Sequence, residues 1–93
     1  MHFMYIHTHS PENCLIDKPQ ELAKMAGQMM EEAKKTNIKV TTYSAHHEHT
    51  IYAIIEADDL AALEKLLTPL TKWGDASLIP VLSVEQRIAT FQK

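Results

Sequence analysis

The opening segment of the chain, MHFMYIHTHSPENC, contains the residues best suited to chemistry: two closely spaced histidines and the only cysteine. Residues 1–9 have the composition of a β-strand, in which alternate side chains share a face. His7 and His9 are therefore predicted to point the same way. Two imidazoles and the thiolate of Cys14 suit a zinc, nickel or copper ion. We predict a transition-metal site formed by His7, His9 and Cys14.

The same residues allow two other interpretations. Without a metal, His7 or His9 could act as an acid or base near neutral pH. The enzyme would then be of the cofactor-independent monooxygenase or isomerase type, with a ligand pocket lined by Tyr5, Tyr43, Tyr52 and Glu56. Alternatively, the histidines and the thiol only pack in a pocket or an interface, and the chain is a non-catalytic assembly domain.

A second group of histidines, His46, His47 and His49, falls in a predicted turn. Turns are normally exposed, so a solvated polar turn is the simplest interpretation. A metal site or a position at a dimer edge are the alternatives.

The composition excludes some classes of function. The net charge of −3 and the pI near 6.0 argue against nucleic acid as a partner. No apolar run approaches the ~20 residues that cross a bilayer, and no signal peptide is recognisable. The expected location is cytoplasmic, and the expected partners are a small molecule or metal ion and a second copy of the chain.

The pattern of the chain predicts one domain over residues 1–93 with the order β-α-β-β-α-β. The predicted strands are 1–9, 39–45, 49–57 and 76–83. Residues 14–17 lead into a first helix that begins near Pro19, and Asp58 or Asp59 caps a second helix that Pro69 kinks. Residues 83–93 form a short helical turn or tail, because Ser83 and Gln86 fit a capping box.

This order predicts an α+β, ferredoxin-like fold. Its four-stranded antiparallel sheet has the order 4-1-3-2 and carries both helices on one face. Within it, we expect strands 1 and 3 to be central and to run in the same direction. The first histidine pair, Cys14 and Glu56 would then share one end of the sheet, where Glu56 could be a fourth ligand or support an imidazole. The turn histidines would lie at the other end, roughly 16 Å away at ~3.3 Å per residue.

The two faces of the sheet are predicted from the third strand. Ile51, Ala53, Ile55 and Ala57 should face the helices, together with Met4 and Ile6. The open face should then carry Phe3, Tyr5, His7 and His9 beside Tyr43, Tyr52 and Ile54. Such a face is too apolar to remain in water, so we expect a homodimer packed sheet to sheet.

Three segments give the chain a resemblance to known proteins: MYIHTHSPENC, YAIIEADDLAAL and KWGDASLIPVL. In these it resembles the dimeric α/β-barrel superfamily of ferredoxin-like proteins. Within that superfamily it is similar to small bacterial and archaeal domains of unknown function that end in a tryptophan, an acidic residue and a Pro-Val strand. The resemblance implies a homodimer with a pocket between sheet and helices or between two sheets. It transfers no catalytic residue to this chain.

Overall fold

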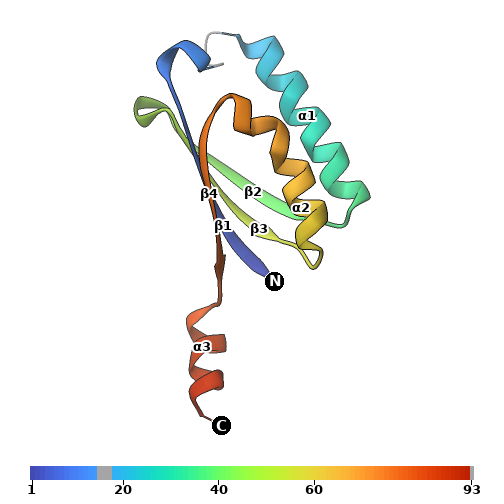
Figure 1. Ribbon diagram of the computed structural model, residues 1–93, viewed down its shortest axis with the longest axis vertical. Coiled ribbons are helices and arrows are strands. Elements are labelled where there is room, and N and C mark those ends of the chain that lie inside the picture. Colours follow the sequence, from blue (N-terminus) through green and yellow to red (C-terminus); the bar gives the residue numbers. More distant parts are fainter. Residues whose placement is uncertain (15–17, 93) are drawn as a thin grey trace.

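The computed structural model describes residues 1–14 and 18–92, so residues 15–17, part of the predicted lead-in to the first helix, lie outside the described residues. Figure 1 shows helices packed beside the strands of a sheet and a last helix that projects from the body. In chain order the elements are β1 (His2–His9), the 3-10 turn η1 (Pro11–Asn13), α1 (Pro19–Lys35), β2 (Lys39–Ala45), η3 (His46–Glu48), β3 (Thr50–Glu56), α2 (Leu60–Leu67), η4 (Thr68–Lys72), β4 (Gly74–Val81) and α3 (Val84–Phe91).

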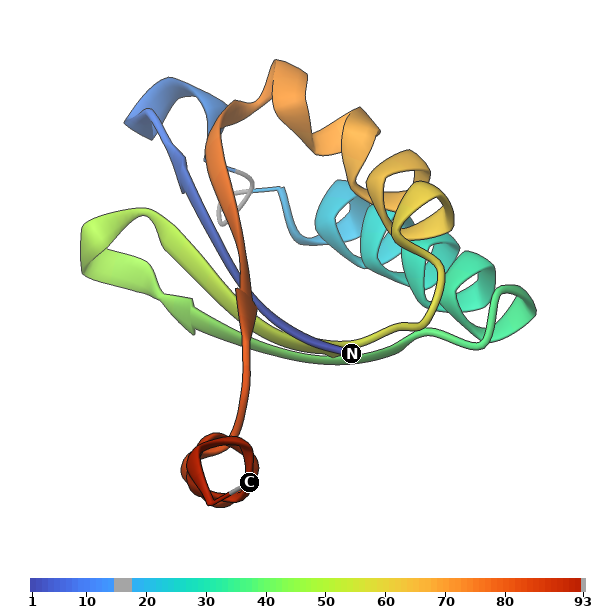
Figure 2. The same ribbon diagram turned by 60° about the horizontal axis from the view of Figure 1, so that its bottom comes forward.

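The four strands form one antiparallel sheet in the order β2-β3-β1-β4. This is the predicted 4-1-3-2 order read from the other edge, and the ferredoxin-like α+β fold is confirmed. Helices α1 and α2 lie together on one side of the sheet (Figure 2). None of the described helices is long and apolar enough to cross a membrane.

The predicted direction of the third strand was wrong. β1 and β3 run antiparallel, with Phe3 opposite Ile55 and His7 opposite Ile51. The reason is topological. A crossover through α1 makes β1 and β2 parallel, and the tight hairpin between β2 and β3 then reverses β3. The end of β1 therefore meets the start of β3, which decides where the histidines lie.

Local sequence signals explain the helix boundaries. Pro19 opens α1 at the first helical position, where a missing N–H costs nothing. The chain leaves α1 through Asn37, in the left-handed region at φ 58°. The Asp59 side chain caps α2 by accepting a 3.1 Å hydrogen bond from the Ala62 N–H. α2 ends at Leu67, and the segment containing Pro69 continues as a 3-10 turn, as the predicted kink requires.

The core lies between the sheet and the two helices. Ala53 and Ile55 contribute to it from β3, and Ala57 from the position directly after β3, as predicted, while Leu63 of α2 is fully buried. On β1, however, Phe3 and Tyr5 are buried on this helix side, which corrects the prediction that they face outward. Residues opposite each other in a sheet share a face, so the odd-numbered residues of β1 follow Ile55 and Ala53. The aromatic rings gain more from burial there than Met4 and Ile6 would.

None of the described helices packs on the other face of the sheet. It presents Met4 and Ile6 from β1 and continues onto the neighbouring strands with Tyr43, Tyr52, Ile54 and Ile79. Ile54 remains 47% exposed. We call this surface the open face. It contains the predicted Tyr43, Tyr52 and Ile54, with Met4 and Ile6 in place of Phe3, Tyr5, His7 and His9.

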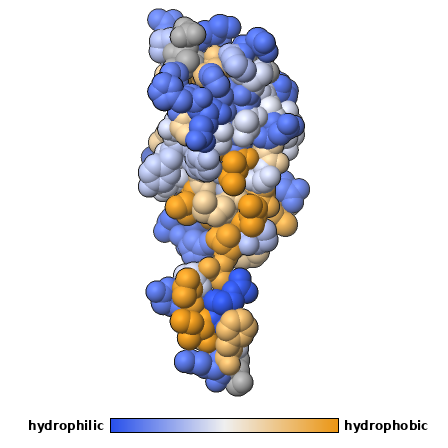
Figure 3. Space-filling model, turned by 90° about the vertical axis from the view of Figure 1, so that its left-hand side faces the viewer, coloured by the Kyte–Doolittle hydropathy of each residue, from blue (hydrophilic) through white to orange (hydrophobic). Residues whose placement is uncertain are grey.

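β4 and α3 form the end of the chain that extends from the body. β4 is an edge strand, as Pro80 predicts, although it begins at Gly74 rather than at Ala76. Ser83 and Gln86 make both hydrogen bonds of the predicted capping box at the start of α3. α3 has no buried residue and exposes Val84, Ile88 and Phe91. Apolar side chains gather along the sheet and continue onto this helix (Figure 3).

Candidate metal site

Two histidines from distant parts of the chain meet where β1 ends. The backbone N–H of His9 donates a 3.0 Å hydrogen bond to the carbonyl of His49, which continues the antiparallel register. The two imidazole rings lie edge to face with centroids 5.7 Å apart. His49 has a left-handed backbone, φ 50°, at the exit of the turn η3. This conformation starts β3 directly beside the end of β1.

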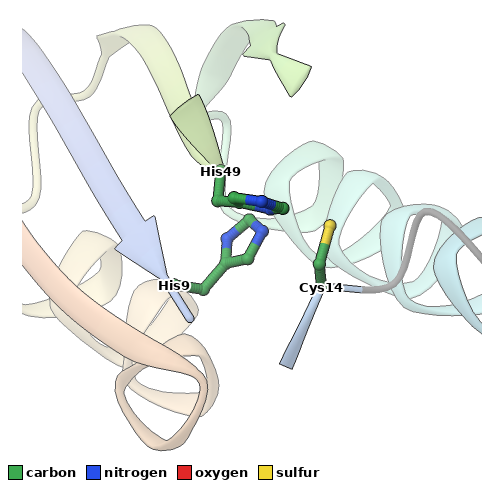
Figure 4. Close-up of side chains that lie close together, drawn as sticks. All are labelled: His9, Cys14 and His49. Carbon is green, nitrogen blue, oxygen red and sulfur yellow. The ribbon is translucent and has the colours of Figure 1, made fainter. Parts of the chain in front are cut away.

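Cys14 reaches the same place from the loop that follows β1. The 3-10 turn η1 reverses the chain, and the Cys14 N–H donates a 3.3 Å hydrogen bond to the Pro11 carbonyl. One ligand atom each from His9, Cys14 and His49 lie within 4.8 Å of one another. Figure 4 shows the two rings and the thiol converging from three separate segments. All three side chains are half-buried.

The electrostatics of the cluster favour neutral imidazole at His9. Burial lowers the pKa of His9, and charge on His7 and then on His49 would lower this pKa further. Nε2 of His9 and Nδ1 of His49 are buried, and neither has a hydrogen-bond partner among the described residues. A buried polar atom without a partner is uncommon and costly. A neutral imidazole nitrogen with a free lone pair is also the form that binds a metal ion.

A cavity of about 70 Å³ adjoins the cluster, between the sheet and the helices. Its described lining combines nitrogen and sulfur donors with an apolar wall and includes no carboxylate. The lining residues are His7, His9, Cys14, Leu22, Met25, Ser44, Ala45, His46, His49, Thr50, Ile51, Leu70 and Trp73. A donor set of this composition suits a transition metal rather than magnesium or calcium, which prefer oxygen ligands.

Gly74 allows the strand that holds His9 to be approached closely. A Cβ atom at this position would lie 2.1 Å from the Thr8 carbonyl oxygen and 2.9 Å from the His9 Cα. β4 can therefore begin against the end of β1 only with glycine here. The position of His9 depends on this contact.

The predicted metal trio of His7, His9 and Cys14 differs from the observed cluster by one residue. His9 and Cys14 come together, and His49 takes the third place. His7 is 2% exposed and lies in the wall of the adjoining cavity. Its ring stacks on that of Tyr5 and is tilted against that of His9, with centroid separations of 6.3 and 5.7 Å.

The other predicted site residues do not gather in this chain. Glu56 is opposite His2 at the far end of the sheet, and its carboxylate lies 3.9 Å from the His2 imidazole, so it cannot support His7 or His9. Tyr5 is buried on the helix side, whereas Tyr43 and Tyr52 face each other across β2 and β3 on the open face. None of the three tyrosines is in the cavity wall.

The turn histidines are not a separate group at the opposite end, as the parallel arrangement predicted. His49 joins the cluster, and His46 lies in the cavity wall with its ring centroid 6.4 Å from that of His49. His47 is exposed. The signal for His49 was present in the sequence, because a short hairpin must reverse the strand that follows it.

The whole sequence, residues 1–93, matches the model of a protein family described as a domain of unknown function, DUF3303. The chain belongs to this family. No curated protein matches the sequence. The membership agrees with the predicted resemblance to small domains of unknown function.

Proposed function

We propose that this DUF3303 chain is a transition-metal-binding domain whose ligands are His9, Cys14 and His49. The observation that supports the proposal best is the convergence of three donor side chains from three segments, with ligand atoms within 4.8 Å of one another. The unpartnered imidazole nitrogens of His9 and His49 add to it, because a bound ion would satisfy such atoms. His7 and the turn residue His46 are then neighbours of the ion and not its primary ligands.

The donors narrow the choice of metal. Two imidazoles and one thiolate suit Zn²⁺, copper or Ni²⁺, and they are poor partners for Mg²⁺ or Ca²⁺. Among the described residues of the cavity wall there is no carboxylate, so Cys14, bound as a thiolate, would be the source of negative charge for the ion. Structural zinc sites have four protein ligands, whereas sites with three protein ligands keep one position for another molecule. The cluster resembles the second kind.

The test is metal binding by the untagged chain, first stripped with a chelator and then titrated with Co²⁺ or Zn²⁺. We expect one ion per chain. Tetrahedral Co²⁺ bound to a thiolate should also give visible and near-ultraviolet absorption bands. Cys14→Ser should abolish the thiolate band, and His49→Asn should weaken affinity by roughly 100-fold, at least as much as the loss of an outer-shell partner. Asparagine is chosen because it tolerates the left-handed backbone at this position.

His47→Asn is the matched control, since it removes an exposed histidine two residues away in the same turn. This variant should bind the ion as the wild-type chain does. Equal affinity in the wild-type, Cys14→Ser and His49→Asn chains would overturn the proposal, as would the absence of stoichiometric binding.

A second proposal concerns assembly, and the open face supports it. We infer that two chains pack through this face as a homodimer, as the resemblance to dimeric α/β barrels implies. Tyr43, Ile54 and Ile79, on β2, β3 and β4, are 59%, 47% and 44% exposed, and β1 lies between β3 and β4 with Met4 and Ile6 on the same face. A contiguous apolar surface of this kind is typical of an interface in a small soluble protein.

A further inference from the structure

His7 is a buried histidine with a defined role for only one of its two ring nitrogens. Its Nε2 lies 3.1 Å from the Leu70 carbonyl oxygen. A carbonyl oxygen only accepts hydrogen bonds, so Nε2 carries the proton and donates it. In a neutral imidazole the other nitrogen, Nδ1, is then an acceptor with a free lone pair. This Nδ1 is buried and has no hydrogen-bond partner among the described residues.

The surroundings of His7 contain the space that a partner for Nδ1 would need. His7 is 2% exposed, and it lines the same 70 Å³ cavity as the metal cluster. Part of the remaining wall is apolar, from Leu22, Ile51 and Leu70. A molecule of water occupies about 30 Å³ in the liquid, and a cavity of about 150 Å³ can hold benzene. The cavity therefore has room for a ligand of a few non-hydrogen atoms.

The proposed metal ion adds a second point of attachment for such a ligand. His9, Cys14 and His49 supply three protein donors, and a tetrahedral ion takes four. A small molecule in the cavity could thus occupy the fourth position and reach His7, whose ring centroid is 5.7 Å from that of His9.

We propose that the site binds a small protic ligand, which coordinates the metal through one atom and donates an adjacent O–H or N–H to Nδ1 of His7. This proposal rests on the proposed function, since it needs the ion. The ligand class contains molecules such as hydroxylamine and hydroperoxides, in which the two groups are neighbours. His7 makes the site prefer a ligand with such a proton, because a ligand without one leaves the buried Nδ1 of His7 without a hydrogen-bond donor.

The experiment compares two ligands on the Co²⁺-loaded chain, without oxygen, by visible absorption. Hydroxylamine coordinates through nitrogen and has an O–H to donate, whereas azide coordinates but carries no proton. His7→Phe keeps a planar ring of similar size and removes the acceptor. We expect this substitution to lower hydroxylamine affinity roughly 3- to 10-fold, the effect of one hydrogen bond, and to change azide affinity less than twofold. His7→Gln, which can donate to Leu70 and still offer an oxygen, should retain the preference for hydroxylamine.

A second measurement needs no variant. In the Zn²⁺-loaded chain with ¹⁵N-labelled histidine, the Nδ1 resonance of His7 should shift when hydroxylamine is added and should move much less with azide. This result keeps the proposal testable if His7→Phe does not fold.

The outcomes separate this proposal from the proposed function. If Co²⁺ does not bind, the metal site itself is wrong. If Co²⁺ binds but neither ligand alters its spectrum, the fourth position is closed, for example by His46, and the present proposal is overturned. An equal loss of affinity for hydroxylamine and azide in His7→Phe would also overturn it, as would an Nδ1 resonance of His7 that hydroxylamine leaves unchanged.

Discussion

At the scale of single residues, Tyr5 carries a hydroxyl in an apolar setting. The side chain is 4% exposed, and its oxygen has no hydrogen-bond partner among the described residues. An unpaired buried hydroxyl costs about 1–3 kcal/mol. We therefore expect Tyr5→Phe to raise the free energy of unfolding by about 1 kcal/mol, measured by urea denaturation. A loss of stability would instead show that the hydroxyl has a partner, such as a buried water.

The same burial gives a pH dependence. Desolvation raises the pKa of Tyr5 above its ordinary value of 10.0. Between pH 10 and this raised pKa, the unfolded chain ionises Tyr5 while the folded chain keeps it protonated. Tyr5 therefore leaves stability unchanged below about pH 10 and lowers it as the pH rises further. The decrease should be smaller in Tyr5→Phe when denaturation is measured across this range, and an identical decrease in both chains would contradict the assignment.

Residue patterns predicted part of the candidate site. Alternation along residues 1–9 correctly indicated that Tyr5, His7 and His9 share a face, and the proximity of Cys14 in sequence suggested that it could join His9. The alternation did not reveal which face of the sheet these residues occupy. The face depends on burial in the whole sheet. Burying Phe3 and Tyr5 gains more free energy than burying Met4 and Ile6 would.

At the scale of elements, the contact between β4 and β1 can be tested through Gly74. A Cβ atom there would overlap the Thr8 carbonyl oxygen, so Gly74→Ala must displace one of the two strands. We expect a loss of about 2 kcal/mol or more in the free energy of unfolding, by urea denaturation, and weaker Co²⁺ binding because His9 moves.

Gly27 provides the matched control for that substitution. It lies within α1, and a Cβ atom there has no neighbour within 4 Å. Gly27→Ala should therefore stabilise the chain by about 0.5–1 kcal/mol through helix propensity, without effect on Co²⁺ affinity. If both alanine variants behaved alike, the close approach of β4 to β1 would not be what makes Gly74 necessary.

Local signals in the sequence predicted the elements well, because capping and turn residues act over a few neighbours. The caps at Asp59 and Ser83 are both found where their residue types indicate. The direction of β3 was predicted wrongly because β1 and β3 were treated as strands joined by a crossover helix, which makes two strands parallel. The crossover rule applies to β1 and β2, which are joined by α1. That single error separated His9 from His49.

At the scale of the whole molecule, the projecting α3 makes the chain elongated, with extents of 51 × 30 × 17 Å. Isolated helices shorter than about 12 residues are marginal in water, and α3 spans only Val84–Phe91 with no buried residue. The proposed homodimer would give this helix and the open face a surface to pack against.

We expect light scattering to give twice the chain mass for the wild-type protein and a dilution-dependent mass for Ile54→Glu. The carboxylate would be introduced at the centre of the open face, where burying it is costly. Ala23→Glu adds the same charge to the exposed surface of α1 and should leave the dimer intact. A monomeric wild-type chain, or equal masses for both variants, would contradict assembly through this face.

The meeting of His9 and His49 also has a consequence for unfolding. An ion bound to both would act as a reversible cross-link between residues 9 and 49, closing a loop that contains α1 and β2. By the loop-closure relation used for disulfides, a cross-link over this span lowers the conformational entropy of the unfolded chain. This raises the free energy of the unfolded chain by roughly 4 kcal/mol. A disulfide is opened by a reductant, whereas this link would be opened by a chelator. The first half of the chain would therefore resist proteolysis according to the supply of free metal.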